Sequence, residues 1–348
     1  MDHDNAVSDA SFIRRTLIVI GLLALTFLVW QLRDILLMIF GAVVIAALFR
    51  SLADTIRRFV PVGGSAALVI SVLLVLGIVI GAGFLFGAQV VSQAETLRAA
   101  IPQAWQAVQS RLSHYGIEVP LQNLTGGGAT GGVMSKVTSF LMSLSGGFTD
   151  TLLIVVGGIF LANQPRFYQE GALKLIPEGK RRIAQQSFED SGRALRLWLK
   201  AQLIAMLLIG LLTTLGLWLL GVPSFLALGL LAGLLEFIPF AGPILSAIPG
   251  ILLSFAISPE LALWTLLLYV GIQNIEGYAI QPMIQQWAVE LPGFILLFSL
   301  LAAGALFGPM GIVFAAPLTV VIYVMVKRLY VQEALDTPTP IPGEGKAG

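Results

Sequence analysis

The chain has 348 residues, of which 57% are hydrophobic and 11% charged, and its formal net charge is +1. A soluble domain carries roughly 25% charged residues, so this chain cannot hide its apolar surface in one water-soluble core. The composition therefore predicts a polytopic membrane protein surrounded by a lipid bilayer.

Several chemistries are excluded by residues or motifs that the sequence lacks. It has no cysteine, which rules out iron–sulfur clusters and thiolate zinc sites. It has no G-x-x-x-x-G-K-[ST] phosphate loop, so it does not hydrolyse ATP by that route, and neither G-x-S-x-G nor H-E-x-x-H occurs. The near-zero net charge gives no sign of a nucleic-acid partner. We therefore expect no enzyme activity, no cofactor and no metal.

The N-terminal part is predicted to hold three transmembrane helices within residues 16–91, after a polar N-terminus of residues 1–15. The apolar runs Thr16–Leu32 and Ile35–Phe49 are both a little short of the ~20 residues that span a bilayer, which predicts a tight helical hairpin. The third run, Ser65–Ala88, is longer. Its glycines include G-x-x-x-G pairs, a spacing that lets helix backbones approach closely.

Residues 92–147 are predicted to lie outside the membrane. Their apolar side chains recur at steps of three and four, which indicates an amphipathic helix protruding beyond the third span. That stripe consists of Leu97, Ile101, Trp105, Val108, Leu112 and Tyr115. The glycine-rich stretch 124–132 is predicted to be a flexible loop, because it has neither the lysine nor the preceding strand of a phosphate site.

A fourth transmembrane helix is expected at 148–162, followed by a basic helical segment at 163–200 with eight Lys or Arg residues and four acidic ones. Positive charges in short loops favour the cytoplasmic side. That rule places both termini and 163–200 in the cytoplasm, and 92–147 outside. Residues 328–348 are predicted to form a cytoplasmic tail, and its Pro- and Gly-rich end, from Asp336 onward, is expected to be disordered.

The transmembrane transport region is predicted at 201–327, and its unusual stretch is 226–256. This stretch is almost wholly apolar, yet it contains Pro239, Pro243 and Pro249. Proline breaks the helical hydrogen-bond ladder, and freed backbone groups are tolerated at membrane depth only where protein or a water-filled cavity receives them. We therefore predict a re-entrant, proline-broken helical hairpin that lines such a cavity.

Full spans are expected on either side of this hairpin, at 201–220 and 261–280, and the apolar pair at 291–327 forms either two spans or a second hairpin. The predicted fold is thus all-α, with about eight transmembrane helices, one re-entrant hairpin and one protruding amphipathic helix. The stretches 230–249 and 300–317 are weakly similar in sequence, since both combine small residues with a Gly-Pro break. Interrupted hydrophobic segments in corresponding positions point to a transporter's binding site.

Glu236 is the leading candidate for a functional side chain, because an ionisable residue inside an apolar segment is a functional hypothesis by default. The alternative is a residue at the membrane interface, with its carboxylate reaching water. Glu276 is the second candidate, with Gln273 one helical turn before it, although Glu276 could instead lie at the membrane edge. The backbone breaks complete the candidate transport or gate residues: Pro239, Gly242, Pro243, Gly308 and Pro309.

From about Tyr168 to Leu335 the chain resembles the AI-2E (autoinducer-2 exporter) family of bacterial inner-membrane transporters. The motifs that carry the resemblance are LKLIPEGKRR (173–182), LWLLGVP (217–223), LLAGLLEFIPFAGPILSAIPG (230–250), IEGYAIQP (275–282), AVELPGF (288–294), LFGPMGIVFAAPL (306–318) and RLYVQEAL (328–335). The N-terminal half fits by topology only. Tyr278 stands where the family often carries Asn, which leaves both a polar role at 278 and the substrate open.

The resemblance implies a multi-span permease of the bacterial inner membrane that exports a small polar solute, such as the quorum-sensing signal autoinducer-2. It also implies homo-oligomers, with a pentamer as one form. Two alternatives remain. Some members of the family look like Na⁺(Li⁺)/H⁺ antiporters, in which case Glu236 would carry the exchanged proton. The chain could also be a membrane scaffold or regulator whose 92–147 segment docks partners.

Overall fold

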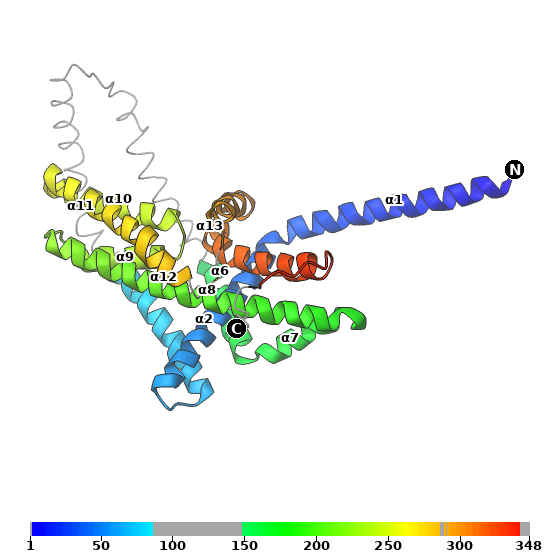
Figure 1. Cartoon of the computed structure of the whole chain (residues 1–348), viewed down its shortest axis with the longest axis horizontal. Coiled ribbons are helices and arrows are strands. Elements are labelled where there is room, and N and C mark those ends of the chain that lie inside the picture. The colour runs from blue at the N-terminus through cyan, green and yellow to red at the C-terminus, as the bar shows by residue number, and fades with distance from the viewer. Residues whose placement is uncertain (1, 86–147, 286–288, 290, 342–348) are drawn as a thin grey trace, which may run out of the picture.

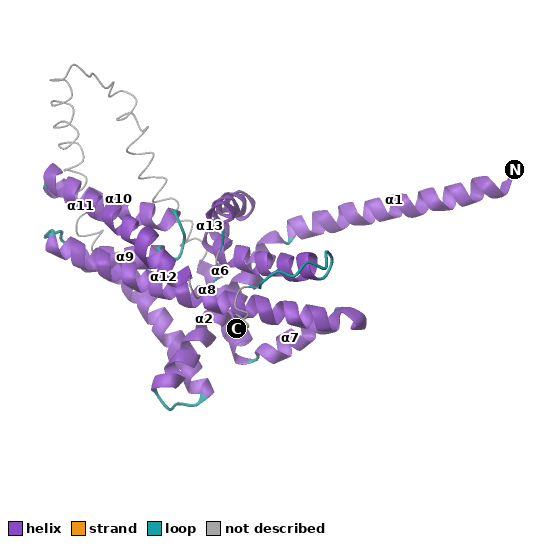
Figure 2. Ribbon diagram, viewed as in Figure 1, coloured by secondary structure: helices purple, strands orange, loops and turns teal. Residues whose placement is uncertain are grey.

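The computed structural model describes residues 2–85, 148–285, 289 and 291–341, and within these ranges all regular structure is helical (Figures 1 and 2). This confirms the all-α class. Four described helices are long and apolar enough to cross a membrane: Arg33–Phe59, Gly64–Leu85, Glu178–Leu219 and Gly293–Gln332. Shorter apolar helices accompany them, as expected of a polytopic membrane protein. The predicted amphipathic helix and glycine-rich loop, within 92–147, lie outside the described residues.

Helix α1 (Asp2–Gln31) extends away from the rest of the molecule (Figure 1). Its large apolar side chains from Leu17 to Trp30 are exposed, so the tight hairpin predicted for the first two apolar runs is wrong. The physical reason is the break itself. A single residue, Leu32, separates α1 from α2 (Arg33–Phe59), and one residue redirects a helix without reversing it.

Helix α2 packs instead against α6 (Phe148–Asn163) through small residues. A Cβ built on Gly158 would lie 2.6 Å from the Ile45 side chain, and one on Gly157 would lie 3.1 Å from Ala42. Glycine therefore sets this close helix contact, as it does in many membrane helix pairs. Arg50 secures the end of the pair, because its Nε donates to the carbonyl of Ala162 over 2.7 Å.

Helix α8 (Glu178–Leu219) follows the short helix α7 (Pro165–Lys174) and has 42 residues. It runs without a break from the basic segment through residue 200 into the apolar span (Figure 1). The main hydrophobic core gathers on its middle, where Leu195 and Leu199 pack in one cluster with Val320 and Val324. The main core of the described residues therefore lies along this helix.

The break predicted within 226–256 lies between α9 (Phe225–Leu235) and α10 (Ala241–Ile257). Helix α9 packs closely along α8, and α10 packs against α11 (Pro259–Ile275). A π-helical turn, η1 (Glu276–Ile280), then leads into α12 (Gln281–Gln285). Turns of this kind are rare and frequently occur at functional sites.

Helix α13 (Gly293–Met325) folds back on itself at Gly308, whose φ of 65° and ψ of −148° are non-helical. A Cβ on Gly311 would overlap the carbonyl of Ala303. In a straight helix, residues eight apart are about 12 Å apart along the axis, so this contact requires two arms lying together. The apolar pair at 291–327 thus forms a folded-back structure about Gly308, followed by η2 (Val326–Gln332).

Disorder is expected from Asp336 onward, but within the described residues the chain from Asp336 to Ile341 packs back onto the protein. Ile341 is 2% exposed and belongs to the main core cluster. Gln332 donates to the carbonyl of Thr339 over 2.6 Å, and Lys327 donates to that of Pro340 over 3.2 Å. A buried isoleucine and two backbone carbonyls held by side chains thus fix a segment whose composition alone suggests a free tail.

Arg328 connects this C-terminal segment to α8. Its side chain donates to Gln332 and, over 2.8 Å, to Gln186 of α8. It also forms an ion pair with Asp190, a buried carboxylate of α8, at 3.7 Å. The tail and the basic half of α8 are therefore parts of one polar network.

Candidate functional site

The connection between α9 and α10 contains a strained turn at Phe240. The N–H of Ala241 donates to the carbonyl of Pro239 over 2.7 Å, and Phe240 between them has φ 62° and ψ −47°. This is a γ-turn of the rare form with positive φ, which side-chain-bearing residues adopt at an energetic cost. Such strain is concentrated in proteins at sites with a function to perform.

Gly242 is required by the same turn. A Cβ at this position would overlap the main-chain carbonyl of Leu235 at the end of α9. Its N–H donates to the carbonyl of Ile238 over 2.8 Å. Pro243 follows in the first turn of α10, where a missing N–H does no harm. The helix therefore restarts directly against the end of the one before it.

Glu236, which directly follows the last residue of α9, is 3% exposed. Its main-chain carbonyl accepts a hydrogen bond of 2.6 Å from the side-chain amide of Gln202 on α8. Its carboxyl oxygen Oε2 is buried and has no hydrogen-bond partner among the described residues. A buried polar atom without a partner is uncommon, because losing water without replacement is unfavourable.

Glu276, the first residue of η1, is 6% exposed. The amide of Gln273 donates to its Oε2 over 2.7 Å, and the amide of Gln281 donates to its Oε1 over 3.2 Å. The carboxyls of Glu236 and Glu276 lie within electrostatic range of each other.

The structure thus joins three of the predicted site residues in one polar cluster, the buried Glu236 and Glu276 and the exposed Gln273. Sequence reasoning missed Gln202 and Gln281. The sequence did contain an indication of both residues, because each is a polar amide within or next to an apolar segment. The sequence places Gln202 in the span expected at 201–220 and Gln281 just after the span expected at 261–280, and nothing local shows which element either one faces.

The other predicted residues belong to the two backbone breaks. Pro239, Gly242 and Pro243 form the first, and Gly308 and Pro309 form the kink of α13. The two breaks are linked by apolar packing rather than by polar contacts. Their common cluster consists of Ile238 and Ala241 from the first, and Leu300, Ala303, Phe307, Ile312, Val313 and Ala315 from α13.

The sequence pattern of the AI-2E family transporters matches residues 17–330 of this chain. The chain belongs to the AI-2E transporter family. The match covers both backbone breaks and both buried glutamates, so these features lie within the family's own region of sequence.

Curated relatives of this AI-2E family member include proteins from three bacteria. The AI-2 transport protein TqsA of Escherichia coli K12 is 27% identical over 273 residues, covering 75% of this chain and 77% of TqsA. YrrI of Bacillus subtilis 168, whose name gives transport as a provisional role, is 28% identical over 198 residues, 57% of this chain and 54% of YrrI. A Thermotoga maritima protein with a similarly provisional name is 27% identical over 192 residues, 53% of this chain and 57% of its own length. The chain thus spans about half the length of YrrI.

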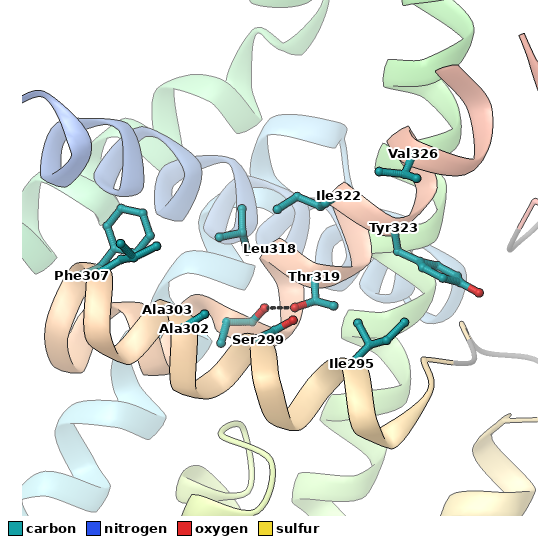
Figure 3. A pocket seen from close by; sticks show the side chains of 12 residues that line it. Ile295, Ser299, Ala302, Ala303, Phe307, Leu318, Thr319, Ile322, Tyr323 and Val326 are labelled. Carbon is teal, nitrogen blue, oxygen red and sulfur yellow. Dashed lines mark hydrogen bonds between the residues drawn. The ribbon is translucent and has the colours of Figure 1, made fainter. Parts of the chain in front are cut away.

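This AI-2E family member also has a cavity of about 300 Å³ between the two arms of α13 (Figure 3). Its walls are apolar apart from Ser299, Thr319 and Tyr323. The Thr319 hydroxyl is already occupied, because it donates to the carbonyl of Ala315 over 2.7 Å. This cavity offers few free polar groups, whereas a polar solute needs several. The glutamate cluster is therefore the stronger candidate for the site.

The carboxyl cluster does not have the composition of a divalent metal centre. Within the described part of the chain, no group of three or more His, Cys, Asp or Glu residues could hold a metal ion. What the cluster offers is two buried carboxyls, the half-buried amide of Gln202 and the exposed amides of Gln273 and Gln281. Groups of this kind bind protons, monovalent cations and hydroxyl-bearing solutes.

Proposed function

We propose that this chain is a bacterial inner-membrane permease that exports a small polar solute, of the autoinducer-2 type, without hydrolysing ATP. Membership of the AI-2E family supports the transport role, and the printed name of the relative TqsA supports the solute class. The observation that carries the proposal is the pair of buried glutamates beside a broken helix in a membrane-embedded region. Ionisable groups in such positions mark substrate or ion pathways.

The polar groups of the cluster suit a solute rich in hydroxyls. Carboxylates accept hydrogen bonds from hydroxyls, and glutamine amides both donate and accept. Glu236, Gln273 and Glu276 would supply this recognition, with Gln202 and Gln281 completing it. Pro239, Gly242, Pro243, Gly308 and Pro309 would form the gate, because backbone that is already broken can change conformation without melting a helix.

A second candidate function, a Na⁺(Li⁺)/H⁺ antiporter, is favoured by one observation. The Glu236 and Glu276 carboxyls lie within electrostatic range of each other, and a proton or a monovalent cation would each reduce the negative charge of the pair by one. In either function the protein would work as a multi-pass membrane protein with cytoplasmic termini and as a homo-oligomer, which blue-native electrophoresis and cross-linking can test.

The test is efflux from proteoliposomes loaded with autoinducer-2. Wild-type protein should release the solute faster than protein-free vesicles do. Glu276→Gln should slow release at least tenfold, because it removes the negative charge and one of the two oxygens that accept amide hydrogen bonds. Glu260→Gln is the matched control, since Glu260 is an exposed glutamate at the start of α11. Release no faster than from empty vesicles would refute export, and Na⁺-dependent pH changes without release would favour the antiporter.

A further inference from the structure

We propose that the cavity between the two arms of α13, here called the α13 groove, is a lipid site. It takes one acyl chain of an anionic phospholipid and holds the phosphate of that lipid at Lys327. This site goes beyond the proposed transport function, and a failure of either one leaves the other intact. Its basis is the lining of the groove, the length of the groove and the charge at one end of it.

The walls of the α13 groove suit a hydrocarbon chain. Its floor includes two small buried side chains, Ala303 and Ala315. Its rim includes large apolar side chains that are exposed, namely Ile295, Leu306, Ile322 and Val326. Because residues of the rim are exposed, the groove opens toward the outside of the chain, where a membrane protein meets lipid. An apolar cavity of this kind excludes water and accepts an apolar ligand.

The length of the α13 groove matches one leaflet of a bilayer. Along the first arm its lining extends from Ile295 to Phe307, a distance of about 18 Å in a helix. Along the second arm it extends from Ala315 to Val326, about 17 Å. The hydrocarbon core of a bilayer is about 30 Å thick, so one leaflet measures about 15 Å. Figure 3 shows Phe307 at one end and Tyr323 and Val326 at the other, so one acyl chain fits the groove lengthwise.

A positive charge lies at the end of the groove that is farther from the kink at Gly308. Lys327 directly follows Val326, which lines the groove. The Lys327 ammonium lies 4.7 Å from the centre of the ring of Tyr323, another lining residue. An ammonium has three N–H donors, and this one donates to the carbonyl of Pro340 over 3.2 Å. Lys327 can therefore also donate to a phosphate oxygen of a lipid whose chain occupies the groove.

The neighbours of Lys327 place this end of the groove at the membrane surface. Arg328, the next residue, contacts Gln186 and Asp190 in the basic part of α8, which precedes its apolar span. Tyrosine and lysine both favour the level of the lipid headgroups. A lipid in the groove would thus have its phosphate beside Lys327 and the end of its chain near Phe307. Basic pockets beside transmembrane helices bind anionic headgroups in this manner.

The first experiment is native mass spectrometry of the full-length protein, released from nanodiscs with equal amounts of phosphatidylglycerol and phosphatidylcholine. The last lipid retained by wild-type protein should be phosphatidylglycerol about fivefold more often, the preference that one lysine provides. Lys327→Gln should bring this ratio close to one. Lys174→Gln is the matched control, since Lys174 is an exposed lysine at the end of α7. A ratio that Lys327→Gln leaves unchanged, or that both variants lower equally, would overturn the proposal.

The second experiment locates the acyl chain, with a phosphatidylglycerol that carries a photoreactive diazirine near the end of one chain. After illumination in nanodiscs, peptide mass mapping should find adducts at least several times more often on α13 than on α1. Helix α1 is the reference surface, because its apolar side chains from Leu17 to Trp30 are exposed. Adducts spread evenly over both helices would refute the site. Fewer adducts on α13 than on α1 would indicate that a second copy of the chain covers the groove, and would refute it as well.

A variant that fills the groove completes this test. Ala302 lines the groove and is exposed, so Ala302→Phe adds a ring to the cavity without displacing a buried neighbour. It should lower the adducts on α13 at least several-fold. Ala305→Phe is the matched control, since Ala305 is an exposed alanine of the same arm outside the lining. Circular dichroism shows whether both variants are folded, and equal labelling of the two folded variants would contradict the groove as the place of the chain.

Discussion

The side chain of Gln202 donates to the main-chain carbonyl of Glu236 over 2.6 Å, across 34 residues of sequence. The carbonyls at the end of a helix lack hydrogen-bond donors within that helix. Here α8 supplies the donor for one of these carbonyls. This hydrogen bond fixes the end of α9 on α8, the longest of the described helices. It also holds the backbone of Glu236 while its carboxyl faces Glu276.

Replacing Gln202 with Leu should destabilise the protein by about 1–3 kcal/mol, because the carbonyl of Glu236 is left without a donor. Thermal unfolding in detergent should show a lower Tm. Gln185→Leu is the matched control, since Gln185 is exposed and donates only to Glu189 on the same helix. That substitution should change stability by less than about 0.5 kcal/mol. An equal Tm for the two variants would contradict the structural role of Gln202.

At position 240 the usual order of stability, in which an alanine variant is more stable than a glycine variant, should be reversed. Both Phe240→Ala and Phe240→Gly remove the ring, but only glycine adopts a φ of 62° without a steric penalty. The glycine variant should therefore be the more stable by about 1 kcal/mol. Chemical denaturation of the two variants side by side measures the difference. A more stable alanine variant would mean that the γ-turn is absent in the membrane.

Gly242→Ala should destabilise the break, because the new methyl group overlaps the carbonyl of Leu235. Overpacking of this kind typically costs about 1–3 kcal/mol. Gly271→Ala is the control within the neighbouring helix α11, where a Cβ meets nothing within 4 Å. There the same substitution should be neutral or stabilising by up to about 1 kcal/mol. Comparable Tm values for both variants would argue against the close approach of α9 and α10.

Ile341→Asp should release the C-terminal segment, because it places a charge in the main core. Limited trypsin digestion should then cut at Lys327 and Arg328 at least several times faster than in the wild-type protein. Leu335→Asp serves as the control, since Leu335 is 54% exposed. If the two variants are digested at the same rate, Ile341 does not anchor the tail in solution.

The broken hairpin could be predicted from the sequence because its cause is local. Proline and glycine act on the backbone at their own positions, so Pro239, Gly242 and Gly308 locate both breaks. The same holds for the all-α class, which follows from long apolar runs. The membrane orientation and the transport roles of these residues stay predictions.

The pairing of Glu236 with Glu276 could not be predicted in the same way. Each glutamate stands out alone, as an ionisable residue among apolar ones, but 40 positions separate them, and no periodicity connects η1 with the end of α9. The packing of the tail through Ile341 could not be predicted for a related reason. A single isoleucine hardly changes the composition of a Pro-rich tail. Its burial depends on core residues that are distant in sequence, so the sequence alone does not reveal it.

The uninterrupted course of α8 has a mechanical consequence. With 42 residues it is a rod of about 63 Å, and Asp190, which pairs with Arg328 near the tail, lies only about 18 Å along it from Gln202, which holds Glu236. No proline interrupts the helix between them. A tilt of this rigid helix at one end therefore also moves the other end. Binding or release of the C-terminal segment would thus shift the position of the buried glutamates.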